Sequence, residues 1–397
     1  MKNVSERINR LSESQTIAMA TRSRELQAEG KDIISLSLGE PDFHTPDRIK
    51  DAAKKAIDDN YTAYTPVSGY LELRQAISKK FKRDNNLDYS PNQIVASTGA
   101  KQSIANVVLS IVNPGDEVIL PAPYWVSYVE IIKMAEGIPV FVEATIESDF
   151  KITAEQLSAA MTDKTKMMIY SSPCNPTGSI YGKAELEALA NVIATRKDFY
   201  VIADEIYEHI NFAGKHESLA QFSSIYDQVI TINGVSKGFA MTGWRLGYIG
   251  APEWIAKACD KIQGQFTSAT CSITQRAVIE AMEMDPSETY HMRDAFKERR
   301  DYVISRLQKM DGVLINEPEG AFYAFPNIEQ LFGKKHNKGT INTATDLCLY
   351  LLEVAEVALV TGEAFGSPEC IRISYATSLD VLKEAMDRIE NALNQLN

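Results

Sequence analysis

The sequence predicts an α/β protein, with a three-layer αβα large domain around a mostly parallel sheet and a smaller α+β domain. Short apolar runs alternate with longer helical patterns through the middle of the chain, as repeated strand–helix–strand units do. From about residue 287 this alternation gives way to a long charged helix pattern and shorter strands. We therefore expect a large domain at 48–286 and a small domain made of 1–47 with 287–397.

Each predicted element has a local reason. Several apolar runs are rich in Val and Ile without alternation, which is typical of strands covered on both faces. The predicted strands are Ile94–Ser97, Glu117–Leu120, Val140–Glu143, Met167–Tyr170, Tyr200–Ala203, Val229–Asn233 and Tyr248–Gly250, followed near the end of the chain by Cys370–Tyr375. Apolar residues at helical spacing predict helices at Ala184–Arg196, His291–Met310 and Thr345–Val354, and a last one from Leu379.

Composition and charge exclude several classes of protein. The chain has 397 residues and a net charge of -12, which argues against a nucleic-acid or anionic-membrane surface. Its five cysteines are odd in number and lack a C-x-x-C pair, so we expect reduced thiols and no metal site. The N-terminus has no apolar signal segment, and no apolar run is long enough to span a membrane. We expect a cytoplasmic protein.

Ligands of open α/β sheets bind beyond the carboxyl ends of the strands, so the residues that follow each strand are informative. Thr98–Gln102 follows the first strand and opens a helix, where free N–H groups bind anions such as phosphate. A glycine at such a turn is also common for purely steric reasons. After later strands come Asp204, which is equally consistent with a helix cap, and Lys237, which lies among small residues unlike a solvated surface lysine.

One chemical interpretation explains these strand ends together. A desolvated lysine near other cations can lose its proton and attack an aldehyde. A pyridine cofactor needs a carboxylate beside its ring nitrogen, and a phosphate needs a helix N-terminus and an arginine. Lys237, Asp204, the Gly99–Lys101 turn and Arg245 supply these groups.

The surrounding motifs resemble the class I aminotransferases that use pyridoxal 5'-phosphate (PLP). Residues 234–247 match the family's lysine signature at every position. Asn175-Pro176-Thr177-Gly178 and Asp204-Glu205-Ile206-Tyr207 match two further motifs in order and spacing. The similarity extends from the Gly39-Glu40-Pro41-Asp42-Phe43 motif to Arg372-Ile373-Ser374-Tyr375-Ala376. It implies the fold type I of PLP transferases.

The resemblance also implies roles for individual residues. Lys237 would form the Schiff base and move the substrate proton, with Asp204 at the ring nitrogen and Tyr207 at the ring's phenolic oxygen. The implied cofactor site consists of Gly99, Ala100, Lys101, Trp125, Asn175, Asp204, Tyr207, Ser236, Lys237, Arg245 and the partner subunit's Tyr64. The implied substrate site consists of Gly39, Lys101, Trp125, Asn175, Arg372, Ser14 and Thr16. For the aromatic neighbours Tyr124 and Tyr128 we expect core packing.

The resemblance implies that Tyr64 is shared between subunits, so we expect a homodimer. The residue at position 101 indicates which substrate the site binds. In well-known aspartate aminotransferases a partner arginine binds the distal carboxylate, but the matching segment here, Gln265–Ser272, contains no arginine. The run Thr98–Gln102 resembles the bacterial Ib subgroup, in which a lysine takes this role. We expect aspartate and other small dicarboxylic amino and keto acids as substrates, with Lys101 as their ligand. The alternative for Lys101 is an exposed helix lysine.

Other activities remain open on the same scaffold. Aspartate and prephenate activities occur together in this subgroup, and an aromatic or alanine aminotransferase would need no cation at Lys101. The scaffold also hosts β-lyases and cyclopropane-forming synthases. A DNA-binding regulator, a nicotinamide dehydrogenase, a phosphate-loop NTPase and a metal hydrolase are disfavoured, because the chain lacks the basic patch, motifs and histidine spacing that these require.

Overall fold

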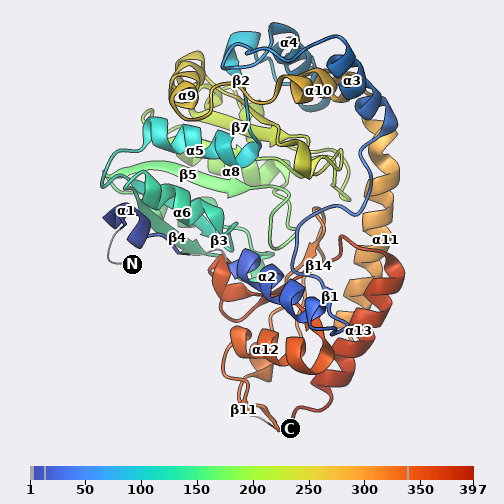
Figure 1. Cartoon of the computed structure of the whole chain (residues 1–397). Helices are drawn as coiled ribbons and strands as arrows, with labels where there is room; N and C mark the ends of the chain where they lie inside the picture. Colours follow the sequence, from blue (N-terminus) through green and yellow to red (C-terminus); the bar gives the residue numbers. More distant parts are fainter. Residues whose placement is uncertain (1–3, 13–14, 338) are drawn as a thin grey trace.

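The centre of the molecule is a seven-stranded sheet, seen in a computed structural model that describes residues 4–12, 15–337 and 339–397 (Figure 1). Its order is β2-β8-β7-β6-β5-β3-β4, and only β8 runs antiparallel to its neighbours. The strands are β2 (Ile94–Ser97), β3 (Glu117–Ala122), β4 (Ile138–Glu143), β5 (Thr165–Ser171), β6 (Tyr200–Asp204), β7 (Val229–Gly234) and β8 (Gly247–Gly250). All seven strands predicted for the middle of the chain are present, and the three-layer α/β class is confirmed.

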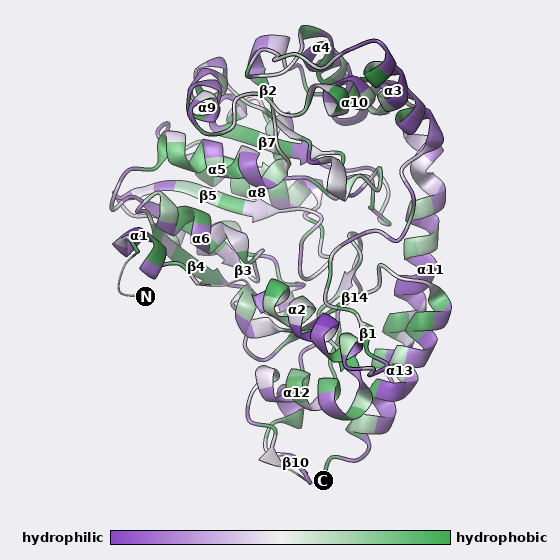
Figure 2. Cartoon of the chain, in the orientation of Figure 1, coloured by the Kyte–Doolittle hydropathy of each residue, from purple (hydrophilic) through white to green (hydrophobic). Residues whose placement is uncertain are grey.

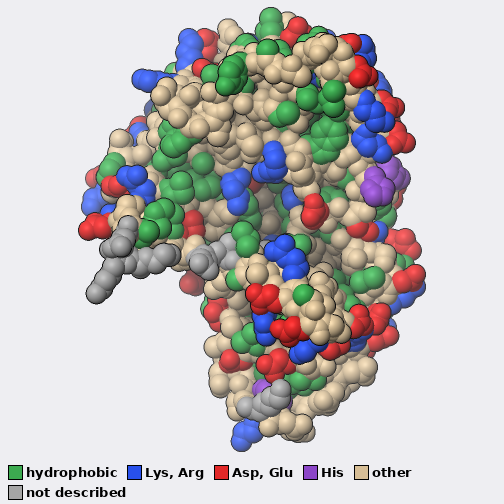
Figure 3. Space-filling view, viewed as in Figure 1, with side chains coloured by type: hydrophobic (Ala, Val, Ile, Leu, Met, Phe, Trp, Pro, Cys, Tyr) green, Lys and Arg blue, Asp and Glu red, His purple; other side chains and the backbone are tan. Residues whose placement is uncertain are grey.

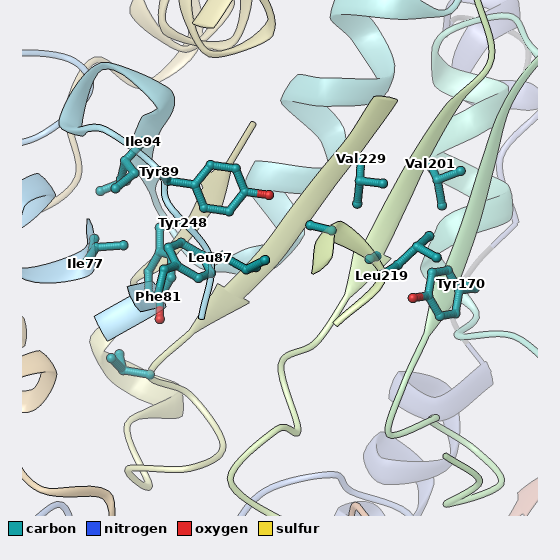
Figure 4. Packing of buried hydrophobic residues seen from close by; sticks show 14 of the residues in the cluster. Ile77, Phe81, Leu87, Tyr89, Ile94, Tyr170, Val201, Leu219, Val229 and Tyr248 are labelled. Carbon is teal, nitrogen blue, oxygen red and sulfur yellow. The ribbon is translucent and has the colours of Figure 1, made fainter. Parts of the chain in front are cut away.

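Helices cover both faces of this sheet. One face packs on α5 (Ala100–Ile111), α6 (Ser127–Met134) and α9 (Glu253–Phe266). The other packs on α3 (Asp47–Asp58), α4 (Leu71–Lys80), α7 (Ala154–Ala160), α8 (Lys183–Ile193) and α10 (Ser272–Glu283). Alternate strand residues serve the two layers, so Val201 and Ala203 of β6 face one while Ile202 faces the other. Figure 4 shows Val201, Val229 and Tyr170 from adjacent strands in the same apolar cluster, and Figure 2 shows apolar residues concentrated in the strands and the adjoining helix faces.

The C-terminal third forms a smaller α+β part with its own apolar core. Its three-stranded antiparallel sheet contains β9 (Tyr323–Ala324), β13 (Val360–Thr361) and β14 (Ile371–Ser374). Its helices are α11 (Tyr290–Leu307), α12 (Ala344–Tyr350) and α13 (Leu379–Leu393), and a short hairpin joins β10 (Lys335–His336) to β11 (Gly339–Thr340). Figure 1 shows α11 running along one side of both parts. The helix predicted over Thr345–Val354 is divided, because its last turn widens to a π-helix at Leu351–Ala355.

The N-terminal segment contacts both parts of the chain. It comprises α1 (Glu6–Asn9), α2 (Gln15–Ala28) and β1 (Ile34–Ser35). β1 pairs in parallel with β12 (Val357–Ala358), and Leu26 and Ile33 share an apolar cluster with Leu352 of the small part. α1 instead lies against the large part, where Arg7 pairs with Glu136 and the Ser12 N–H donates to Glu130. The domains 48–286 and 1–47 with 287–397 remain a prediction. Among the described residues, no helix is both long and apolar enough to cross a membrane.

Candidate active site

A cavity of about 260 Å³ lies at the carboxyl ends of β5, β6 and β7, where the two parts of the chain meet. Parallel strands end at one edge of a sheet, so the residues following them converge there. Its lining consists of Ile17, Gly39, Ala100, Lys101, Ile104, Trp125, Val126, Ser127, Tyr128, Ser171, Asn175, Asp204, Ile206, Tyr207, Ser236, Lys237, Thr242, Arg245, Tyr323 and Arg372. Most of the residues that the sequence predicted for the site are therefore brought together, although their roles remain predictions.

Lys237 follows β7 and places its amine inside the cavity. Nζ donates a hydrogen bond to the Gly39 carbonyl at 2.6 Å, and it has no ion-pair partner among the described residues. The pKa of Lys237 is lowered to about 8, chiefly by burial; Arg372 and Arg245 contribute to this shift, whereas Glu40 and Asp204 oppose it. A substantial fraction of the amine is therefore neutral near physiological pH, as a nucleophile or general base requires.

Asp204, the last residue of β6, is held in place by two donors. The Tyr128 hydroxyl donates to Oδ2 at 2.6 Å, and the Ile206 N–H donates to Oδ1 at 3.3 Å. Burial raises the pKa of Asp204 to about 6, and the Tyr128 hydrogen bond counteracts this shift. Tyr128 does pack in the core as predicted, but its hydroxyl has this additional function. A buried tyrosine needs a partner for its hydroxyl, which was the available sequence signal.

The N-terminus of α5 and Arg245 form an anion-binding end of the cavity. The first N–H groups of a helix have no intrahelical acceptor, and here the Gly99–Lys101 turn, where α5 begins, lies beside Arg245. Gly99 has φ +86°, and a Cβ there would lie 2.5 Å from Arg245 Nη2, so glycine is required for this close approach. Ser236 adds a hydroxyl to the cavity wall. This donor set fits a phosphate group.

Arg372 of β14 is a buried cation that has unused hydrogen-bond donors. Its Nη1 donates to Asn175 Oδ1 at 3.0 Å and its Nη2 to the Ser37 carbonyl at 2.6 Å. Its Nε has no hydrogen-bond partner, and no carboxylate of the described residues pairs with this arginine, which is only 2 % exposed. Burial lowers the pKa of Arg372, although not enough to remove its charge. An uncompensated buried guanidinium favours binding of a carboxylate.

Lys101 and Trp125 form another part of the cavity wall. Lys101 Nζ lies 5.0 Å from the Trp125 ring centroid and has no ion-pair partner among the residues that the structure describes. Partial desolvation, and then repulsion from Arg245, lowers the pKa of Lys101. Trp125 also meets the Tyr128 ring edge to face at 5.3 Å. Lys101 is thus exposed toward the cavity, consistent with either a ligand or a solvated helix lysine.

Tyr207 contacts a residue that the sequence did not indicate. The hydroxyls of Tyr207 and Tyr323 lie 2.9 Å apart, and both rings are buried. Burial raises the pKa of Tyr207 well above its ordinary value, so its hydroxyl stays protonated and can donate to a bound oxygen. Tyr323 belongs to β9 of the small part, 116 residues away in sequence, which explains why local patterns missed it.

Tyr64, Thr16 and Ser14 complete the set of predicted site residues. Tyr64 is 99 % exposed and does not line its own chain's cavity. Thr16 lies in α2 beside Ile17, whose side chain lines the cavity. Ser14 lies outside the described residues.

The cavity as a whole is strongly cationic. Lys101, Lys237, Arg245 and Arg372 face it against one carboxylate, Asp204, in a protein whose net charge is -12. Figure 3 shows Lys and Arg side chains gathered at the level where the upper and lower parts meet. The residues fit a PLP cofactor: an amine, a carboxylate held by two donors, and a glycine-lined helix N-terminus beside an unpaired arginine.

A comparison with protein families decides the class of this site. Residues 31–389 match the family model described as aminotransferase class I and II. The chain belongs to this aminotransferase family. The predicted resemblance to class I aminotransferases is thereby confirmed, and the chain is a transaminase by family.

Individual relatives of this aminotransferase cover nearly the whole chain. It is 46% identical over 396 residues to a bifunctional aspartate aminotransferase and glutamate/aspartate-prephenate aminotransferase from Petunia hybrida, covering 98% of this chain and 83% of the relative. The aspartate aminotransferase of Rhizobium meliloti has the same fold, with a TM-score of 0.97, 41% identity and full coverage of both chains. An aspartate aminotransferase of Thermus thermophilus, solved with maleate, gives a TM-score of 0.92 at 37% identity, covering 99% of this chain and 100% of that one.

Proposed function

We propose that this aminotransferase uses PLP and transfers the amino group of aspartate to 2-oxoglutarate, giving oxaloacetate and glutamate. The observation that carries the proposal is a single cavity lined by one buried carboxylate, Asp204, and four cations that have no ion-pair partner among the described residues. A phosphate, an α-carboxylate and a distal carboxylate supply three anionic groups that would compensate these cations. Neutral ligands would leave several charges unpaired, which is costly in a desolvated site.

In this proposal, different residues bind the cofactor and transfer the proton. When bound, PLP supplies an aldehyde that joins an amine and a pyridine ring that withdraws electrons. The α5 N-terminus, Ser236 and Arg245 would hold its phosphate, and Asp204 would keep the ring nitrogen protonated. Lys237 Nζ, with its pKa near 8, would then take the proton from the substrate Cα and return it.

The substrate would be oriented at its two ends. Arg372 would bind the α-carboxylate through its free donors, with Asn175 fixing the guanidinium plane. Lys101, which lines the same cavity, would bind the distal carboxylate and thereby select dicarboxylic donors. The maleate bound by the similar Thermus thermophilus enzyme is a dicarboxylate of comparable length.

A half-reaction panel tests both the cofactor and the substrate class. We expect aspartate and glutamate to convert the enzyme faster than alanine or phenylalanine, as followed by the absorbance of the cofactor. In Lys101→Ala, aspartate should lose about ten- to a hundredfold in kcat/KM, because a charged hydrogen bond contributes roughly 1.5–3 kcal/mol. Alanine should be nearly unaffected. Equal losses for aspartate and alanine would contradict the role of Lys101.

A second candidate is prephenate aminotransfer alongside the aspartate reaction. The name of the Petunia hybrida relative includes both activities, at 46% identity to this chain. Prephenate also carries two carboxylates, so the same cations would serve it. Turnover of prephenate with aspartate or glutamate as donor separates a dual enzyme from an aspartate-specific one.

We also propose a homodimer in which each subunit completes the other's site. Tyr64 is 99 % exposed, and Ile57, Leu71 and Phe266 are apolar and at least half exposed, an unfavourable arrangement for an isolated chain. In the dimer, the partner subunit's Tyr64 would reach the phosphate end of the cavity. Sedimentation should give twice the 44.1 kDa chain mass. Tyr64→Phe should weaken PLP binding by about tenfold, whereas a monomer of full activity would contradict the shared site.

We propose that the protein is located in the cytoplasm. All five cysteines are free, as thiols are in reducing compartments. Fractionation of the producing cells measures the location directly.

A further inference from the structure

The turn after β6 has two sides. Asp204 and Tyr207 face the cavity, whereas Glu205 and Glu208 point away from it into the interior. Glu205 is 1 % exposed and Glu208 is 7 % exposed. A buried carboxylate is costly unless a cation or several donors compensate it. The groups that pair with Glu205 and Glu208 therefore help to fix the turn after β6, which places Asp204 and Tyr207 in the cavity.

Glu208 forms an ion pair with a lysine. Lys80, at the end of α4, contacts Oε1, and Asn85 Nδ2 donates to Oε2 at 2.8 Å. His209 Nε2 lies 3.2 Å from the same Oε1. The charge of Glu208 is therefore balanced by the ammonium group of Lys80.

Among the described residues, the only group that can form an ion pair with Glu205 is a histidine, whose charge depends on pH. Ser218 Oγ donates to Oε1 at 2.6 Å, and His216 Nε2 lies 3.0 Å from Oε2, with both side chains of this ion pair buried. No lysine or arginine of the described residues forms an ion pair with Glu205. The charge of Glu205 is thus balanced when the His216 imidazole carries a proton and is uncompensated when it does not.

Several charged groups decide the protonation of His216. Burial by itself lowers its pKa, but the charge and hydrogen-bonding capacity of Glu205, followed by Glu208, outweigh burial, while Lys80 opposes them. The net result is a pKa of His216 above its ordinary value. The stabilisation is then complete below the unfolded-state pKa of about 6.5 and is lost as pH rises through the higher folded-state value.

We propose that His216 is a positioning residue that, in its protonated form, anchors Glu205 and so holds Asp204 and Tyr207 in the geometry the cofactor site needs. This inference rests on the proposed function for its catalytic meaning, but the ion pair itself is a property of the protein without cofactor. The anchor also makes the site sensitive to pH from a position outside the cavity.

A bound metal ion is the competing explanation. Oxygen and nitrogen atoms of Glu205, Glu208 and His216 lie within 4.8 Å of one another. Lys80 already contacts Glu208, and its ammonium would repel a divalent cation at the same place. A proton on His216 balances the cluster without this repulsion.

The first test observes the imidazole in the apoenzyme. NMR of histidine-labelled protein should show a ring that is charged at pH 7, titrates above pH 6.5 and is missing in His216→Asn. In Glu205→Gln the same ring should become neutral at pH 7, which keeps the test decisive if His216→Asn folds poorly. A neutral His216 in the unmodified protein, or a signal that changes with EDTA, would overturn the proposal.

The second test measures the coupling to the active site. Below pH 6.5, His216→Asn should bind PLP about tenfold more weakly than the unmodified protein, the equivalent of one pKa unit, and this ratio should approach one as pH rises. The thermal midpoint of the apoenzyme should fall by about 4–6 °C over the same pH range. His209→Asn is the matched control. It should change the PLP affinity and the thermal midpoint far less, because Lys80 still balances Glu208. A ratio that is independent of pH would refute the anchor, whereas an unmodified protein that fails to bind PLP would refute the proposed function instead.

Discussion

Lys237→Ala is expected to lower kcat by about 10⁴-fold or more, because in the proposed mechanism one amine would serve as both the covalent attachment point and the proton carrier. Among the described residues that line the cavity, none is a ready substitute: Lys101 lies beside Trp125, and arginine side chains do not lose their proton in proteins. Steady-state rates with aspartate and 2-oxoglutarate measure the loss.

Borohydride reduction followed by peptide mass spectrometry provides an independent check. The unmodified enzyme should carry the reduced adduct on the peptide containing Lys237, and Lys237→Ala should carry none. Lys183→Ala, an exposed lysine at the start of α8, is the matched control and should retain both activity and adduct. An adduct on another lysine in the unmodified enzyme would remove the basis of the proposed mechanism.

Arg372→Met should separate activity from stability. Every amino acid donor should lose about 10²- to 10⁴-fold in kcat/KM, since removing one partner of a desolvated charge pair costs roughly 3–5 kcal/mol. The apoenzyme should keep or increase its free energy of unfolding, because the substitution removes a buried cation that no carboxylate of the described residues compensates.

Kinetics on two donors and a denaturant titration check this result. Lys101→Ala offers the contrast, since it should affect aspartate and spare alanine, whereas Arg372→Met should affect both alike. A large loss of stability in the Arg372 variant would mean that this side chain serves the fold rather than substrate binding.

The sequence predicted the central fold because buried parallel strands are near-continuous apolar runs. Tyr200–Ala203 and Val229–Asn233 could therefore be placed within one residue of β6 and β7. The strand-end rule then indicated that Asp204 and Lys237 would converge. Motif resemblance, rather than local physics, added the remote Arg372, which lies on a strand of the small part.

Contacts between distant side chains could not be predicted in this way. Tyr128 and Asp204 are 76 residues apart, and Tyr207 and Tyr323 are 116 apart, so no local period relates them. For Tyr128 the sequence led us to expect core packing, which does not indicate the partner of its hydroxyl. The pairing of Glu205 with His216 likewise depends on how the loop after β6 folds back, which hydrophobic periodicity does not describe.

The cation-lined cavity also bears on how long the enzyme survives in a cell. Mutual repulsion among Lys237, Arg245 and Arg372 weakens the native state until anions enter. A ligand that binds only the folded chain stabilises it by mass action, by about 2.7 kcal/mol at a hundred times its dissociation constant. Scarcity of the vitamin from which the cofactor is made would then shift newly synthesised chains toward proteolysis, so nutrient supply would set enzyme abundance as well as turnover.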